Sequence, residues 1–90
     1  MDESRDVLRA SFLEVVDNQL RDGTPLATRQ TFERLQREGL TASKAKELIA
    51  AIVAAEVFNM VKHKRTFDER RFVERSHQLP KLPWDDDDAE

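Results

Sequence analysis

The first hydrophobic pattern along the chain runs from Val7 to Leu20. Apolar side chains recur every three or four positions, which places them on one face of an α-helix. These residues are Leu8, Phe12, Val15, Val16 and Leu20. Gly23 follows, and glycine often ends a helix because it adopts the left-handed backbone conformation without strain. The pattern therefore predicts an amphipathic helix over residues 5–22.

A second helix is expected directly after this glycine. Thr24 offers a hydroxyl that can cap a helix N-terminus, and Pro25 has a fixed φ that suits the first helical position. The segment then carries Phe32 on its inward face until Gly39 interrupts the pattern. These signals predict a helix over residues 25–38.

The third segment is the longest and most apolar, and Thr41 is placed to cap it. Between Leu48 and Val61 only two polar side chains occur, so the segment is apolar on nearly every face. Such a helix is typical of a protein centre or of a subunit interface. We predict a helix over residues 42–63 that the other helices leave partly uncovered. The face that we assign to self-association comprises Ile52, Val53, Val57 and Met60.

A short fourth helix is expected over residues 69–78. Asp68 has the position of an N-cap, and Phe67 and Phe72 have the spacing of a hydrophobic staple across the helix start. The segment Leu79–Trp84 contains two prolines and cannot continue the helix.

The C-terminal part divides into an apolar segment and an acidic one. We call Leu79–Trp84 the proline-rich strap, and we expect its apolar side chains, Leu79, Leu82 and Trp84, to fold back on the helices. Residues 85–90 hold five acidic side chains and nothing to bury, so they are predicted to be a disordered acidic tail. Residues 1–84 are then a single helical domain.

The predicted fold is all-α: a compact four-helix bundle with short turns and roughly antiparallel neighbours. A folded chain of 90 residues buries only ~60–65% of its unfolded surface, which leaves little room for a large catalytic cleft. The serines lie in no strained, glycine-flanked turn, and the two glycines are isolated and form no phosphate-binding loop. We therefore expect no catalytic residue, no cofactor and no enzymatic activity.

Several features favour a cytoplasmic location. The chain has no cysteine, which suits a reducing compartment and removes thiolate metal sites. Its first residues are acidic, where a signal peptide would be basic. The longest uncharged run, Leu48–Ala55, is eight residues long, whereas a membrane-spanning helix needs ~20. We expect no membrane partner.

The net charge of −3 conceals a basic segment. Residues 1–84 carry 15 basic and 13 acidic side chains, and within residues 62–75 six bases meet three acids. A polyanion or a protein partner would meet this segment first. The residues that we assign to such a contact are Lys62, Lys64, Arg65, Arg70 and Arg71. The turn between the second and third helices also has the spacing of a helix-turn-helix, but the third helix is too apolar to read bases.

Glu56 is the one charged residue within the apolar stretch Leu48–Val61 of the third helix, so its function requires an explanation. With Asn59 and His63 it lies on one helix face, in a spacing like that of the Glu-x-x-His ligands in metal-binding bundles. Asparagine stands where the histidine should be, so we expect no metal. A buried carboxylate must be paired, and we interpret Glu56 as a structural residue held by an arginine or a backbone group. His77 is expected to be a solvated or helix-capping residue.

Short motifs link the first three helices to a known kind of domain. They are Asp17-Asn18-Gln19-Leu20, Asp22-Gly23-Thr24-Pro25, Thr31 with Arg34-Leu35, and Glu38-Gly39-Leu40. With the apolar helix that follows, they resemble an uncharacterised bacterial family of short helical domains of unknown function, some fused to a C-terminal zinc motif. Members often carry histidines in the first and third helices, where this chain has Leu13-Glu14 and Ser43, Lys44 and Glu47. The resemblance covers residues 10–75 and implies a helical fold without an activity.

Three hypotheses for function follow, in order. The first is a non-enzymatic protein-interaction or self-association module of the bacterial cytoplasm, with a protein partner or a homodimer. The alternative is a nucleic-acid-associated accessory protein that uses the basic segment 62–75. A small enzyme without a recognisable motif is the third.

Overall fold

The computed structural model describes residues 3–83, which form four α-helices and no strand. The helices are α1 (Glu3–Asp22), α2 (Leu26–Arg37), α3 (Ala42–His63) and α4 (Glu69–Gln78). The predicted all-α bundle is confirmed, and the bounds of α3 and α4 agree with those expected from the sequence. The first helix begins two residues earlier than predicted, and the second is one residue shorter at each end.

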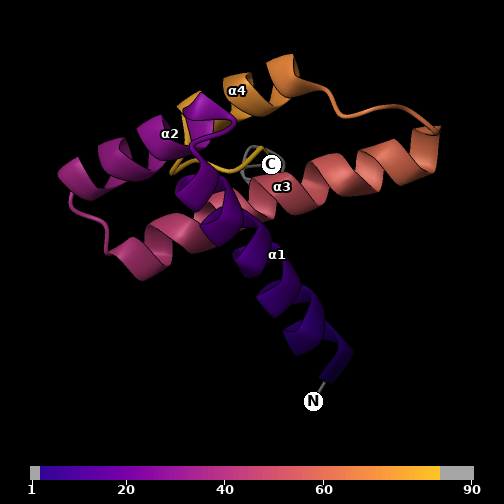
Figure 1. Cartoon of the computed structure of the whole chain (residues 1–90), viewed down its shortest axis with the longest axis horizontal. Coiled ribbons are helices and arrows are strands. Elements are labelled where there is room, and N and C mark those ends of the chain that lie inside the picture. The colour runs from indigo at the N-terminus through magenta and orange to yellow at the C-terminus, as the bar shows by residue number, and fades with distance from the viewer. Residues whose placement is uncertain (1–2, 84–90) are drawn as a thin grey trace, which may run out of the picture.

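The helices do not all lie antiparallel (Figure 1). Along α2, α3 and α4 the chain reverses direction at each turn, as predicted, whereas α1 crosses α3 steeply. Helix α3 packs against each of the other three helices. The most apolar helix is thus the central one, as its sequence indicated.

Every helix contributes to one hydrophobic core. Fully buried apolar side chains come from all four helices and from the first residue after α4; the larger ones are Val16, Leu35, Ile49, Ile52, Phe72 and Leu79. Leu82 packs against the same cluster. The prediction that Leu79 and Leu82 fold back on the bundle is confirmed, while Trp84 and the acidic tail lie outside the described residues.

The turn between α2 and α3 is formed by the two residues from which it was predicted, Gly39 and Thr41. Gly39 has a φ of +106°, and its N–H and that of Leu40 bond to the carbonyls of Gln36 and Leu35 at the end of α2. This pattern is a Schellman motif, which satisfies carbonyls that the helix leaves free. Thr41 then caps α3 by accepting from the Lys44 N–H over 3.1 Å.

The start of α4 confirms the predicted cap and staple. The Asp68 carboxylate accepts from the Arg71 N–H over 3.0 Å, and the rings of Phe67 and Phe72 lie 5.7 Å apart between centroids. Phe72 is fully buried, so this contact fixes the direction in which the chain enters the helix.

The predicted start of α2 is wrong by one residue. Pro25 is the N-cap, with extended backbone (φ −68°, ψ 148°), and no side chain caps the helix. The extended ψ of Pro25 keeps this residue out of the helix, which begins at Leu26. Thr24 therefore lies one position too early to bond to the first helical N–H groups.

No helix within residues 3–83 is long and apolar enough to cross a membrane.

Two buried hydroxyl groups provide a test of this packing. Thr28 donates to Gln19 Oε1 over 2.8 Å and joins α2 to α1, whereas the Ser76 hydroxyl has no hydrogen-bond partner among the described residues. Thr28→Val should lower the free energy of unfolding by ~1 kcal/mol, because Gln19 loses its donor. Ser76→Ala should leave it unchanged or raise it by up to ~1 kcal/mol, because an unpaired buried hydroxyl is removed.

Urea denaturation of the two variants and the parent chain measures both effects. A larger loss for Ser76→Ala than for Thr28→Val would contradict the described packing of α4.

Candidate interaction site

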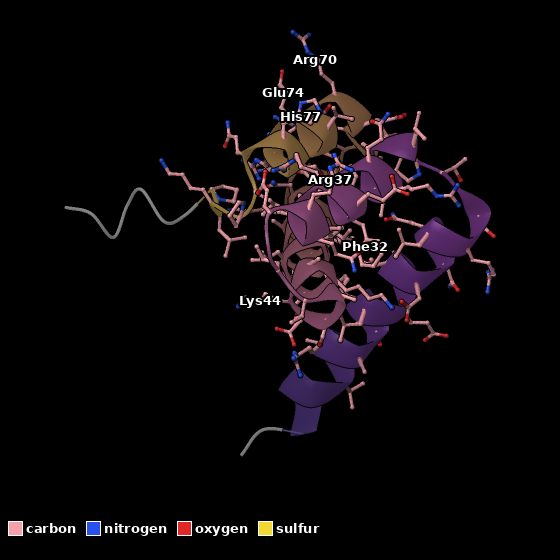
Figure 2. The ribbon with its side chains drawn as sticks, turned by 90° about the vertical axis from the view of Figure 1, so that its left-hand side faces the viewer. Phe32, Arg37, Lys44, Arg70, Glu74 and His77 are labelled. Carbon is pink, nitrogen blue, oxygen red and sulfur yellow. The ribbon has the colours of Figure 1, made fainter. Side chains whose placement is uncertain are left out.

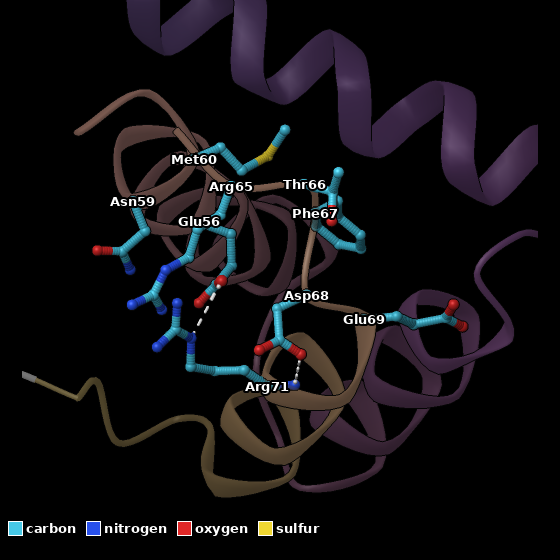
Figure 3. A pocket seen from close by; sticks show the side chains of 9 residues that line it. All are labelled: Glu56, Asn59, Met60, Arg65, Thr66, Phe67, Asp68, Glu69 and Arg71. Atoms are coloured by element: carbon cyan, nitrogen blue, oxygen red, sulfur yellow. Dashed lines mark hydrogen bonds and ion pairs between the residues drawn. The ribbon is translucent and has the colours of Figure 1, made fainter. Parts of the chain in front are cut away.

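Glu56 is the only buried charged residue among those whose side chains are described, with 1% of its surface exposed. Arg71 donates from Nε to Glu56 Oε1 over 3.3 Å, and Arg75 donates from Nη1 to Oε2 over 3.2 Å. The two arginines are four residues apart and therefore lie on one face of α4. Figure 3 shows Arg71 reaching Glu56 across the gap between the helices. Each carboxylate oxygen thus has its own guanidinium partner.

This geometry confirms the prediction that an arginine holds Glu56 in place. Asn59, one turn further along α3, lines the same cavity as Glu56, while His63 is exposed at the helix end. Within the described part of the chain, no three His, Cys, Asp or Glu side chains are grouped so that they could hold a metal ion. His77 is exposed, and its carbonyl accepts from Arg34 over 3.5 Å.

A cavity of about 530 Å³ lies where α3 meets α4 (Figure 3). Its charged wall residues are two arginines and three carboxylates: Arg65, Arg71, Glu56, Asp68 and Glu69. Two of the carboxylates have structural roles, since Glu56 holds α4 and Asp68 caps it. Because the charges of both signs offset each other, the cavity does not form a strong anion site.

Two of the five basic residues predicted for a polyanion contact are engaged in ion pairs within the chain. Arg71 is held by Glu56, and Arg70 pairs with Glu74 across 3.5 Å. Figure 2 shows Arg70 and Glu74 on the outer side of α4, away from the other helices. The other three, Lys62, Lys64 and Arg65, are exposed at the end of α3 and in the turn that follows. We call these three residues the basic turn.

Half of the predicted self-association face is buried in the single chain. Ile52 is 0% exposed and Val53 4%, because both point toward the other helices of the bundle; Val57 and Met60 are half-buried. The assignment of Ile52 and Val53 to a free surface is therefore wrong. With nearly every position of α3 apolar, the sequence did not indicate which face the core would occupy.

The uncovered face of α3 comprises other residues. Phe58 is 61% exposed and Val61 73%, whereas Ala51 and Ala54 on the same face are half-buried. Their spacing of three and four residues aligns them along one side of the helix. We call Ala51, Ala54, Phe58 and Val61 the α3 seam. The alanines did not single out this face in the sequence, because Ala45 and Ala50 of the same helix are buried in the core.

The alanine half of the seam is the floor of a groove. This cavity of about 340 Å³ has walls from Phe12 and Leu13 of α1 and from Leu82 of the proline-rich strap. Arg9, which pairs with Glu47 across the groove, and Lys44 add charge to the lining. An apolar hollow thus lies directly beside two exposed apolar side chains.

Glu56→Gln tests the ion pair between α3 and α4. The free energy of unfolding should fall by ~1–3 kcal/mol, because two arginines lose their charged acceptor. Glu74→Gln is the matched control: its pair with Arg70 is exposed, so its loss should be under ~0.5 kcal/mol. Denaturant melts give both values, and equal losses in the two variants would contradict the structural role of Glu56.

Comparisons with known proteins assign no family to this chain. No family model matches it, and neither does a curated protein or a solved structure. The resemblance to short bacterial helical domains therefore stays a prediction.

Proposed function

We propose that this chain is a non-enzymatic protein-interaction module of the cytoplasm that acts by self-association. The observation that carries the proposal is the α3 seam, where Phe58 and Val61 are mostly exposed beside an apolar groove. Single exposed apolar residues are common on protein surfaces, but a contiguous apolar patch next to a hollow is typical of an interface.

The position of the seam supports the same proposal. It lies on the central helix, which packs against α1, α2 and α4. A surface on such a helix is fixed by the core and loses little conformational freedom when a partner binds. An aromatic side chain at its centre is the kind of residue that contributes most to association.

A second copy of the chain is the occupant that best fits this surface. Each copy offers both a protruding part, Phe58 and Val61, and a receiving part, the groove over Ala51 and Ala54. A two-fold symmetric interface uses the same patch on both copies, so this patch must offer both parts, because a residue i that contacts residue j is matched by a contact of j with i.

Phe58→Ser tests self-association. At tens of micromolar the parent chain should have about twice the 10.5 kDa mass of one copy, and the variant should have the mass of one copy. Burying a phenylalanine contributes ~2 kcal/mol, and each dimer buries two, so the dissociation constant should rise at least ~100-fold. Light scattering or sedimentation over a concentration series measures it.

Leu26→Ser is the matched control, because Leu26 is 59% exposed but lies at the start of α2, outside the α3 seam. This variant should keep the mass of the parent chain. A single-copy mass for the parent chain throughout the series would overturn the proposed function.

A further inference from the structure

We propose that two copies pair through their α3 helices in antiparallel orientation, with Phe58 of each copy opposite Ala54 of the other and Val61 opposite Ala51. This inference rests on the proposed self-association and specifies its geometry. It follows from the spacing, the sizes and the charges along one side of α3.

The spacing of the seam is that of a coiled coil. Ala51, Ala54, Phe58 and Val61 are separated by three, four and three residues, the repeat that keeps side chains facing a partner helix. In an antiparallel pair with this repeat, the two types of seam position face each other across the interface. A two-fold axis level with residue 56 then gives four successive layers.

The sizes of the side chains select this arrangement. Each of the four layers contains one alanine and one large residue, so the volume per layer is nearly even. A parallel pair in register would instead place Phe58 against Phe58 and alanine against alanine, which crowds one layer and leaves a void in the next. Both defects are unfavourable in a close-packed interface.

The groove is the site that receives these side chains. It has a volume of about 340 Å³ and is lined by both alanines of the seam. Phe58 of the same chain cannot fill it, because it lies on the same helix, one turn beyond Ala54. Phe58 and Val61 of a second copy reach the groove from above, with α1 and Leu82 as its walls.

The charges at the ends of the seam favour the antiparallel orientation as well. Glu47 lies one turn before Ala51, and the basic turn lies beyond Val61. Antiparallel pairing brings Glu47 of each copy, together with Arg9 and Lys44, beside the basic turn of the other, whereas parallel pairing brings the two wholly basic turns together. Opposed helix dipoles add to this preference.

Cysteine cross-linking tests the register, since the chain has no cysteine of its own. Two single-cysteine variants, Ala51→Cys and Val61→Cys, are treated with a short thiol-reactive cross-linker, separately and as an equimolar mixture. The mixture should give a cross-linked dimer that contains one copy of each variant. Each variant alone should cross-link at least ~10-fold less, because equal positions are ten residues, or ~15 Å along the helix, apart.

A pair of exchanged side chains tests the neighbouring layer, that of Ala54 and Phe58, without a cross-linker. Ala54→Phe alone should weaken association by overpacking, and Phe58→Ala alone should weaken it by leaving a void, each at least ~10-fold. The double variant Ala54→Phe, Phe58→Ala restores one alanine and one phenylalanine per layer and should recover association to within ~3-fold of the parent chain. Circular dichroism melts of each variant monitor whether the bundle stays folded.

The outcomes separate this inference from the proposed function. A dimeric mass in which each variant cross-links equally well alone would overturn the antiparallel register and leave self-association in place. Failure of the double variant to recover association, with the fold intact, would also overturn the register. A single-copy mass for the parent chain would overturn both.

Discussion

The structure depends on one constraint, the need of a buried carboxylate for a partner. Glu56 lies in the most apolar helix at 1% exposure, where an unpaired charge would cost several kcal/mol. Arg71 and Arg75 satisfy it from α4, a ten-residue helix that is too short to be stable alone. Arg34 of α2 adds a further polar contact by donating to the Ser76 carbonyl in the last turn of α4. The short helix is thus oriented by polar contacts around its fully buried apolar side chain, Phe72.

The orientation of α3 that buries Glu56 also leaves one side of this helix free. Glu56 shares the inward side of the helix with Ile49 and Ile52, because all three are buried among the other helices. The opposite side is then left with Ala51, Ala54, Phe58 and Val61. The interface that we propose is therefore a consequence of how the helix is held in the bundle, and the alanines are the positions where a second helix can approach most closely.

The parts of the fold that local chemistry determines could be predicted from the sequence. Thr41, Asp68 and Gly39 act within a few residues of their own positions, and each was assigned correctly. It could be predicted that Glu56 has a partner, because a buried carboxylate requires one. The sequence did not show which arginines supply it. The free side of α3 could not be predicted, because Ile52 and Phe58 look equally apolar in the sequence and only tertiary packing distinguishes them. The start of α2 was missed because the backbone of Pro25 stays extended.

The central claim is that the charge of Glu56 holds α4 on the bundle, and native-state hydrogen exchange tests it most directly. In the parent chain, amides of α4 such as that of Phe72, which bonds to the Asp68 carbonyl, should be protected against exchange. In Glu56→Gln, protection should fall about tenfold or more in α4, while the α3 amides around Ile49 and Ile52 lose much less. Unchanged protection in α4, or an equal loss in both helices, would contradict the account.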